Sequence, residues 1–174
     1  SDLDTMNPLL GESPDPELIA KITETVLNHK MVIGVHDIVV HDYGPGRRIV
    51  SLHAEVPYNK DMMEVHDLMD HIEMRLMEEY HCEATIHMDP VVTDDEEVNE
   101  TRKEVFNIVK KYDKTLSVHD FRMVKGPTHT NVIFDLVIPY GKDYEPEKIV
   151  KDLKQKIKDE MQGKHYAVIR VDRF

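Results

Sequence analysis

The sequence predicts an α+β protein of two tandem domains, each with the element order α-β-β-α-β, a small three-stranded mixed sheet and two helices packed on one face. Segments with apolar residues at helical spacing are separated by short segments in which β-branched and polar residues alternate. The pattern of the first half then recurs, and the dipeptide His36-Asp37 returns 83 positions later as His119-Asp120. A repeat of this length indicates duplicated domains rather than the shorter units of a solenoid.

The first domain is predicted over residues 17–92, after a polar segment, residues 1–16, whose prolines and glycine indicate a linker or arm. A hairpin is expected from strands over residues 31–42 and 49–56, because a turn sequence, Tyr43-Gly44-Pro45-Gly46, joins them. A short strand over residues 84–89 is expected to stop at Pro90. Two helices have apolar stripes, formed in turn by Leu18, Ile19, Ile22, Thr25 and Val26, and by Met62, Val65, Met69, Ile72 and Leu76.

The second domain, predicted over residues 93–174, repeats these elements. Thr93-Asp94-Asp95-Glu96 has the form of a capping box at the start of its first helix. Its second helix has a stripe of three apolar residues, Ile149, Leu153 and Ile157. Strands are expected over residues 116–124, 132–138 and 166–171. The α-β-β-α-β order is that of ferredoxin-like and metallochaperone-like domains.

Composition limits the classes of partner. With 22 basic and 34 acidic residues the net charge is −12, so nucleic acid would be repelled and cations attracted. The 11 histidines are many for 174 residues, and imidazole is the commonest protein ligand for transition metals. The single cysteine, Cys82, is consistent with a reducing compartment. We expect a soluble chain, since no apolar run is long enough to span a bilayer and no signal peptide opens the sequence.

The first half contains a candidate metal site. His87 and Asp89 lie two positions apart on one strand, so their side chains point to the same side of the sheet. The hairpin supplies two further imidazoles, and the helix beside it supplies one. Nitrogen and oxygen ligands of this kind suit Zn²⁺, and also Mn²⁺, Fe²⁺, Co²⁺ or Cd²⁺. The candidate ligands are His36, His53, His66, His87 and Asp89.

Each of these residues also has a simpler interpretation. A single histidine on a strand is usually a hydrogen-bonded or exposed side chain, and His66 with Asp70 could be a surface pair at i, i+4 spacing. The six methionines from Met62 to Met88 could suggest a soft metal, but Met62 and Met69 lie on the apolar stripe and are better explained as core residues. Spacing alone therefore proposes a site without proving one.

Several motifs together resemble the cytosolic C-terminal domain of cation diffusion facilitator transporters, and the match covers residues 9–90. They are Leu9-Leu10-Gly11-Glu12-Ser13-Pro14-Asp15, Gly34-Val35-His36-Asp37, Leu52-His53-Ala54-Glu55-Val56, Val65-His66-Asp67 and Thr85-Ile86-His87-Met88-Asp89-Pro90. The resemblance implies a homodimer at the cytoplasmic face of a membrane, attached to its own transmembrane domain and active in export of Zn²⁺ or related ions. It also implies that His36, His53, His66, His87 and Asp89 form a two-metal cluster that regulates transport.

The second half departs from that pattern. Three candidate ligands are replaced: His53 aligns with Asp135, His66 with Lys148 and His87 with Arg170. The two basic side chains would repel a cation and could pair with Asp135 or Asp172 instead. We therefore expect no high-affinity metal in the second domain.

Other functions remain open at this stage. The chain could be a free-standing metal buffer or chaperone, or a ferredoxin-like small-molecule regulatory domain in which the histidines are incidental. A two-metal hydrolase would use similar ligands. We do not expect an enzyme, because no nucleophile, phosphate-binding glycine loop or general acid has suitable spacing.

Overall fold

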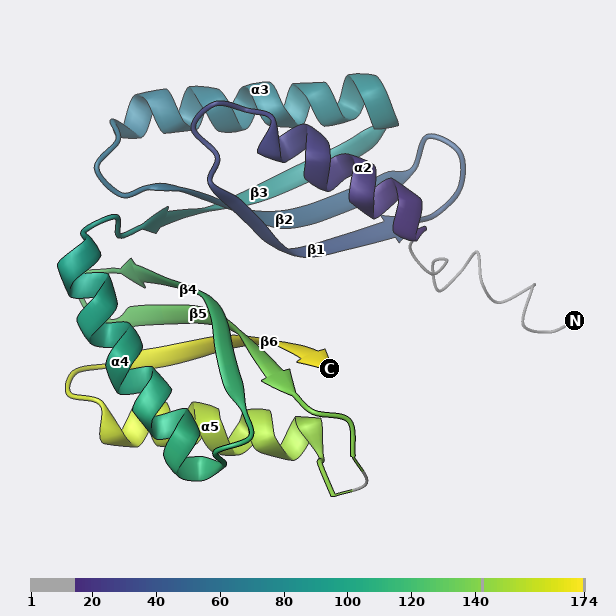
Figure 1. Ribbon diagram of the computed structural model, residues 1–174. Helices are drawn as coiled ribbons and strands as arrows, with labels where there is room; N and C mark the ends of the chain where they lie inside the picture. Colours follow the sequence, from purple (N-terminus) through teal and green to yellow (C-terminus); the bar gives the residue numbers. More distant parts are fainter. Residues whose placement is uncertain (1–14, 142, 174) are drawn as a thin grey trace, which may run out of the picture. The chain divides into compact units, whose positions relative to one another are not determined.

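A computed structural model describes residues 15–141 and 143–173 (Figure 1). The described residues form four helices and six strands, with antiparallel and parallel strand pairs, so the predicted α+β class is confirmed. The chain divides into two compact units, which we call unit 1 (residues 1–90) and unit 2 (residues 91–174). Among the described helices, none is long and apolar enough to cross a membrane.

Unit 1 has the predicted element order: α2 (Pro16–Leu27), β1 (Gly34–Asp42), β2 (Arg48–Pro57), α3 (Met62–Tyr80) and β3 (Cys82–Val91). Strands β1 and β2 form an antiparallel hairpin, and β3 follows β2 in the sheet. Both helices lie on the same side of these strands (Figure 1). Within unit 1, neither described helix covers the opposite side of these strands.

Local chemistry sets the ends of the helices in unit 1. The Asp15 side chain accepts a hydrogen bond from the backbone N–H of Glu17, and Pro16 occupies the first helical turn, where its missing N–H costs nothing. Asp61 caps α3 in the same way, through the N–H of Glu64. At the other end of α3, His81 adopts a left-handed conformation, with φ 54°, that closes the helix.

The core of unit 1 joins the apolar faces of both helices to β2. The predicted stripe of α3 is buried at Val65, Met69, Ile72 and Leu76. Met62 is the exception, because it lies in the first turn of the helix and is 73% exposed. On β2 the alternate residues Val50, Leu52, Ala54 and Val56 are buried against the helices. Each buried aliphatic side chain contributes about 1.5–3 kcal/mol through removal from water.

Unit 2 repeats the order with α4 (Asp95–Tyr112), β4 (Ser117–Lys125), β5 (Thr130–Ile138), α5 (Pro146–Glu160) and β6 (His165–Arg173). Strands β4 and β5 are antiparallel, and β5 and β6 are parallel. Ile149, Leu153 and Ile157 of α5 are buried against the sheet, as their spacing predicts. The two halves of the chain therefore share one pattern of elements and core.

Some boundaries differ from the predictions. Strand β3 does not stop at Pro90 but continues to Val91, which pairs with Val124 of β4 inside unit 2. The six strands follow one another in the sheet order β1 to β6, so the prediction of two separate three-stranded sheets is not confirmed. The cap of α4 is Asp94 rather than Thr93, because the Asp94 carboxylate accepts from the N–H groups of Glu96 and Glu97. Of the predicted linker, residues 1–14 lie outside the described residues.

Candidate metal centre

Three side chains from the three strands of unit 1 meet at one point. His36 lies on β1, His53 on β2 and Asp89 on β3, and their ligand atoms all lie within 4.8 Å of one another. One carboxylate oxygen, Asp89 Oδ2, is 3.2 Å from His36 Nε2 and 3.0 Å from His53 Nδ1. The two imidazole rings stack, with their centroids 4.7 Å apart. Two imidazoles and a carboxylate are a donor set that fits Zn²⁺ and similar ions.

The position of His36 depends on an irregularity in β1. The register of β1 on β2 shifts between His36 and Val39, and Asp37 has a φ of 51°. A bulge of this kind inserts an extra residue and changes the direction of the side chains beside it. Aspartate tolerates the left-handed conformation better than most residues do. In the dipeptide His36-Asp37, the histidine is therefore a candidate ligand and the aspartate forms the bulge that orients it.

A fourth side chain, Glu55, belongs to the site and was missed in the sequence. It lies on β2 two positions after His53, is only 1% exposed, and its Oε2 is 3.2 Å from His36 Nδ1. Gly34 pairs with Glu55 across the hairpin, and a Cβ at Gly34 would lie 2.5 Å from that same oxygen. The signal available in the sequence was an acidic residue two positions after His53, on the same side of the strand.

The two carboxylates change the protonation of His36. Burial by itself would lower the pKa of His36, but its hydrogen bonds with Asp89 and Glu55, and their negative charges, raise that pKa from 6.5 to about 9. Burial would raise the pKa of Asp89, but its hydrogen bonds with His36 and His53 hold that pKa below its ordinary value of 3.8. The cluster thus holds a proton on His36 at neutral pH, and a metal ion that bound His36 would have to displace it.

The other two predicted ligands lie at different distances from this point. His87 stacks on His53, with ring centroids 4.5 Å apart, and its Nε2 is 3.5 Å from Asp89 Oδ1. It is at the rim, with 68% of its side chain exposed. His66 is on the exposed surface of α3, where its Nδ1 is 3.7 Å from Asp70 Oδ2. The structure therefore brings His36, His53 and Asp89 together, with His87 beside them, and leaves His66 outside the group.

The equivalent position in unit 2 holds an ion pair instead. Arg170 Nη2 is 2.9 Å from Asp135 Oδ2, which confirms the predicted pairing of these residues. Lys148, by contrast, pairs with Asp152 one helical turn away at 3.2 Å. Among the described residues, the group formed by His36, His53 and Asp89 is the one that could hold a metal ion.

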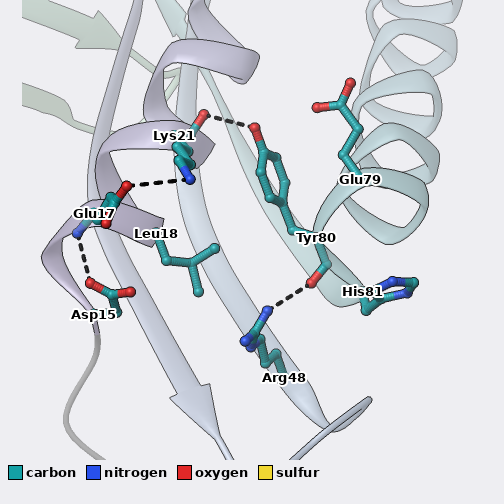
Figure 2. A pocket seen from close by; sticks show the side chains of 8 residues that line it. All are labelled: Asp15, Glu17, Leu18, Lys21, Arg48, Glu79, Tyr80 and His81. Atoms are coloured by element: carbon teal, nitrogen blue, oxygen red, sulfur yellow. Dashed lines mark hydrogen bonds and ion pairs between the residues drawn. The ribbon is translucent and has the colours of Figure 1, made fainter.

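Unit 1 also contains a cavity of about 340 Å³ between α2 and the end of α3, shown in Figure 2. Its charged groups are engaged with their neighbours. Lys21 pairs with Glu17 at 3.4 Å, and Arg48 donates to the carbonyl oxygen of Tyr80 at 3.2 Å. Tyr80 in turn donates to the Lys21 carbonyl oxygen. The cavity is explained by the packing of two helix ends, and it offers a ligand few unpaired groups.

Known proteins are similar to part of the chain. An uncharacterized transporter of Methanocaldococcus jannaschii is 40% identical over 84 residues, a match that covers 48% of this chain and 29% of the transporter. The chain thus spans less than a third of that relative. Two solved structures of CzrB, a proposed zinc transporter, also match. The first is 27% identical and covers 45% of this chain and 98% of the other, with a TM-score of 0.43. The second, a zinc form, is 25% identical over 45% and 90%, with a TM-score of 0.39.

The family match is more extensive. The family described as "Cation efflux protein, cytoplasmic domain" matches twice, over residues 14–91 and residues 98–174. Each match covers one α-β-β-α-β unit. This is a family of transporter domains rather than a class of enzymes. The chain therefore belongs to the cytoplasmic domain family of cation efflux proteins and contains that domain in two copies.

Proposed function

We propose that this chain is the regulatory, metal-binding cytosolic part of an efflux transporter for Zn²⁺ or a related divalent cation. The observation that supports this best is the convergence of His36, His53 and Asp89, whose ligand atoms lie within 4.8 Å of one another in a chain of this family. His87 completes the set from the rim, and His66 is proposed as a further ligand from α3. Asp89, which contacts both hairpin imidazoles, is suited to bridge two ions.

The donor atoms favour a borderline cation. Imidazole nitrogens and carboxylate oxygens suit Zn²⁺, and they also accept Mn²⁺, Fe²⁺, Co²⁺ and Cd²⁺. Cys82, the one soft thiol, is fully buried in the core of unit 1 and belongs to the hydrophobic cluster. We take Zn²⁺ as the ion for the tests below.

Neutralisation of the buried carboxylates by a metal ion supplies a mechanism for regulation. Asp89 and Glu55 are 7% and 1% exposed, and they lie in the half of the chain that holds its excess of negative charge. A divalent ion would neutralise the cluster and link β1, β2 and β3. Binding would then favour one arrangement of the cytosolic domains in a homodimer and report metal abundance to the transmembrane domain.

The two copies have different roles in this proposal. Residues 17–92 would be the metal-binding domain, and residues 93–174 a second domain of the same layout, a three-stranded sheet with two helices on one face. Because Arg170 occupies the position of His87, we propose that unit 2 binds no metal tightly. It would act as a spacer or as a dimerisation surface.

Isothermal titration of the full chain with Zn²⁺ tests the proposal. The double variant His87→Ala and Asp89→Ala should lose tight binding while its circular dichroism stays that of a folded protein. The matched control is the pair at the equivalent positions of unit 2, Arg170→Ala and Asp172→Ala, which should bind zinc as the wild type does. Undiminished binding by the first variant would refute the assignment of the site.

A further inference from the structure

Glu55 is a buried carboxylate in a strand, and burial of a charged group without compensation is costly. It is 1% exposed, and its Oε2 lies 3.2 Å from Nδ1 of His36. An ionised carboxylate can only accept hydrogen bonds, so His36 Nδ1 is the donor in this contact. The other ring nitrogen, Nε2, faces Asp89 at 3.2 Å.

We propose that Glu55 is a positioning residue of the metal centre, which holds the His36 ring so that Nε2 is the nitrogen presented to the ion. The inference rests on the proposed function of the site. A carboxylate that accepts from the outer N–H of a ligand histidine fixes the ring orientation, and loss of such a partner typically lowers metal affinity about 10–100-fold. Glu55 itself need not contact the metal.

Gly34 is the second part of this arrangement. A side chain at Gly34 would meet the Glu55 carboxylate, with a Cβ only 2.5 Å from Oε2 and 2.9 Å from Cδ. The absence of a side chain therefore lets the carboxylate lie against β1 within reach of His36. Gly34 and Glu55 are direct partners in the register of the hairpin, so a change at either residue affects the same contact.

Unit 2 replaces both residues together. In the register of β4 on β5, Ser117 pairs with Val137 at the place where Gly34 pairs with Glu55. Two positions further along β4, His119 pairs with Asp135, where unit 1 pairs His36 with His53. Unit 2 has no imidazole at the β5 position equivalent to His53. It thus also lacks the counterparts of Glu55 and Gly34. The fold tolerates an apolar residue at this position, which makes Glu55→Val a usable variant.

Zinc titration of the full chain with three variants tests the inference. Glu55→Val should bind about 10–100-fold more weakly than the wild type. Glu55→Gln keeps a hydrogen-bond acceptor and should retain most of the affinity. The matched control is Glu83→Val, which removes the same charge from an exposed position on β3 and should change affinity by less than about two-fold, because exposed charges interact weakly.

A spectroscopic measurement separates positioning from a general loss of stability. In the zinc-loaded wild type, ¹⁵N chemical shifts of the His36 ring should show the proton on Nδ1 and the metal on Nε2. The same pattern is expected for Glu55→Gln, and its loss or averaging for Glu55→Val. Gly34→Ala should lower zinc affinity in the wild type but not in the Glu55→Val background, since both changes disturb one contact.

The outcomes distinguish this inference from the proposed function. If the wild type binds zinc and folded Glu55→Val binds it equally well, the positioning role is overturned and the site stands. Equal losses in Glu55→Gln and Glu55→Val would also overturn it, because charge rather than the hydrogen bond would then be responsible. If the wild type binds no zinc, both proposals fail.

Discussion

Units 1 and 2 have the same elements in the same order but differ in net charge. Unit 1 has 6 basic and 18 acidic residues, a net charge of −12, whereas unit 2 has 16 of each and is neutral. All of the net charge of the chain therefore lies in the half that contains the histidine cluster. The fold does not require that charge, because unit 2 forms the same elements without it. We infer that the charge of unit 1 serves the attraction of cations.

The residues that both units keep are also informative. His119-Asp120 repeats His36-Asp37 in a unit that we expect to bind no metal tightly. Asp120 has a φ of 53°, and the register of β4 on β5 shifts beside it, as at Asp37. The aspartate is thus explained by the bulge in both units. The aspartate of the motif supports backbone geometry in both units. Among the described residues, only the histidine of unit 1 belongs to a group of three side chains close enough to hold a metal ion.

The largest expected effect is the transfer of a metal site into unit 2. The four substitutions Ser117→Gly, Asp135→His, Val137→Glu and Arg170→His would reproduce the residues of unit 1 around His119 and Asp172. Titration with Zn²⁺ should then show a second set of binding sites in the chain. Addition of Asp172→Ala to this variant should remove them again. A folded variant with unchanged zinc stoichiometry would mean that the two units differ in more than these side chains.

Zinc should raise the free energy of unfolding of unit 1 and leave that of unit 2 unchanged. A ligand that binds only the folded state at 100 times its Kd adds about 2.7 kcal/mol to the free energy of unfolding. We expect that gain for unit 1, and no gain for unit 2. Hydrogen exchange can assign it, because amides of β1 and β2 report on unit 1 and those of β4 and β5 on unit 2. Equal protection of both hairpins by zinc would contradict the assignment, and a chelator should reverse the effect.

The fold was more predictable than the site. The α3 stripe, Val65, Met69, Ile72 and Leu76, was found from spacing alone and is buried in the structure. His66 follows Val65, and neighbouring residues on a helix point about 100° apart, so burial of the stripe turns His66 toward solvent. Helical geometry thus explains why His66 lies outside the strand cluster in this structure, and its role as a ligand from α3 stays a proposal.

Glu55 shows why part of the site could not be predicted. Strand alternation places it on the same side as Ser51 and His53, which is the wetter side of the hairpin. Ser51 is exposed there, but Glu55 is 1% exposed. The difference comes from the register of the hairpin, which places Gly34 opposite Glu55. That pairing was not evident from the sequence. Long-range pairing, rather than local pattern, determines the surroundings of this carboxylate.

A pH dependence of stability should be found in metal-free unit 1. The pKa of His36 is about 9 in the folded protein against 6.5 ordinarily, so the folded state retains a proton that the unfolded chain releases. The resulting stabilisation, on the order of 2 kcal/mol, is complete below pH 6.5 and is lost as the pH rises to about 9. Urea unfolding between these pH values measures it. The slope should flatten in His36→Gln, and an equal slope in that variant would assign the effect to another group.

The smallest expected effect compares the two bulges directly. Asp37→Val and Asp120→Val place a β-branched residue at a left-handed position, which costs about 1–2 kcal/mol. Because both aspartates have nearly the same φ, 51° and 53°, the loss of unfolding free energy should be similar for the two variants. Zinc affinity should fall only for Asp37→Val, since only that bulge holds a proposed ligand, His36. If Asp120→Val left stability unchanged while Asp37→Val reduced it, the shared backbone role of the motif would be wrong, and Asp37 would owe its place to the metal site alone.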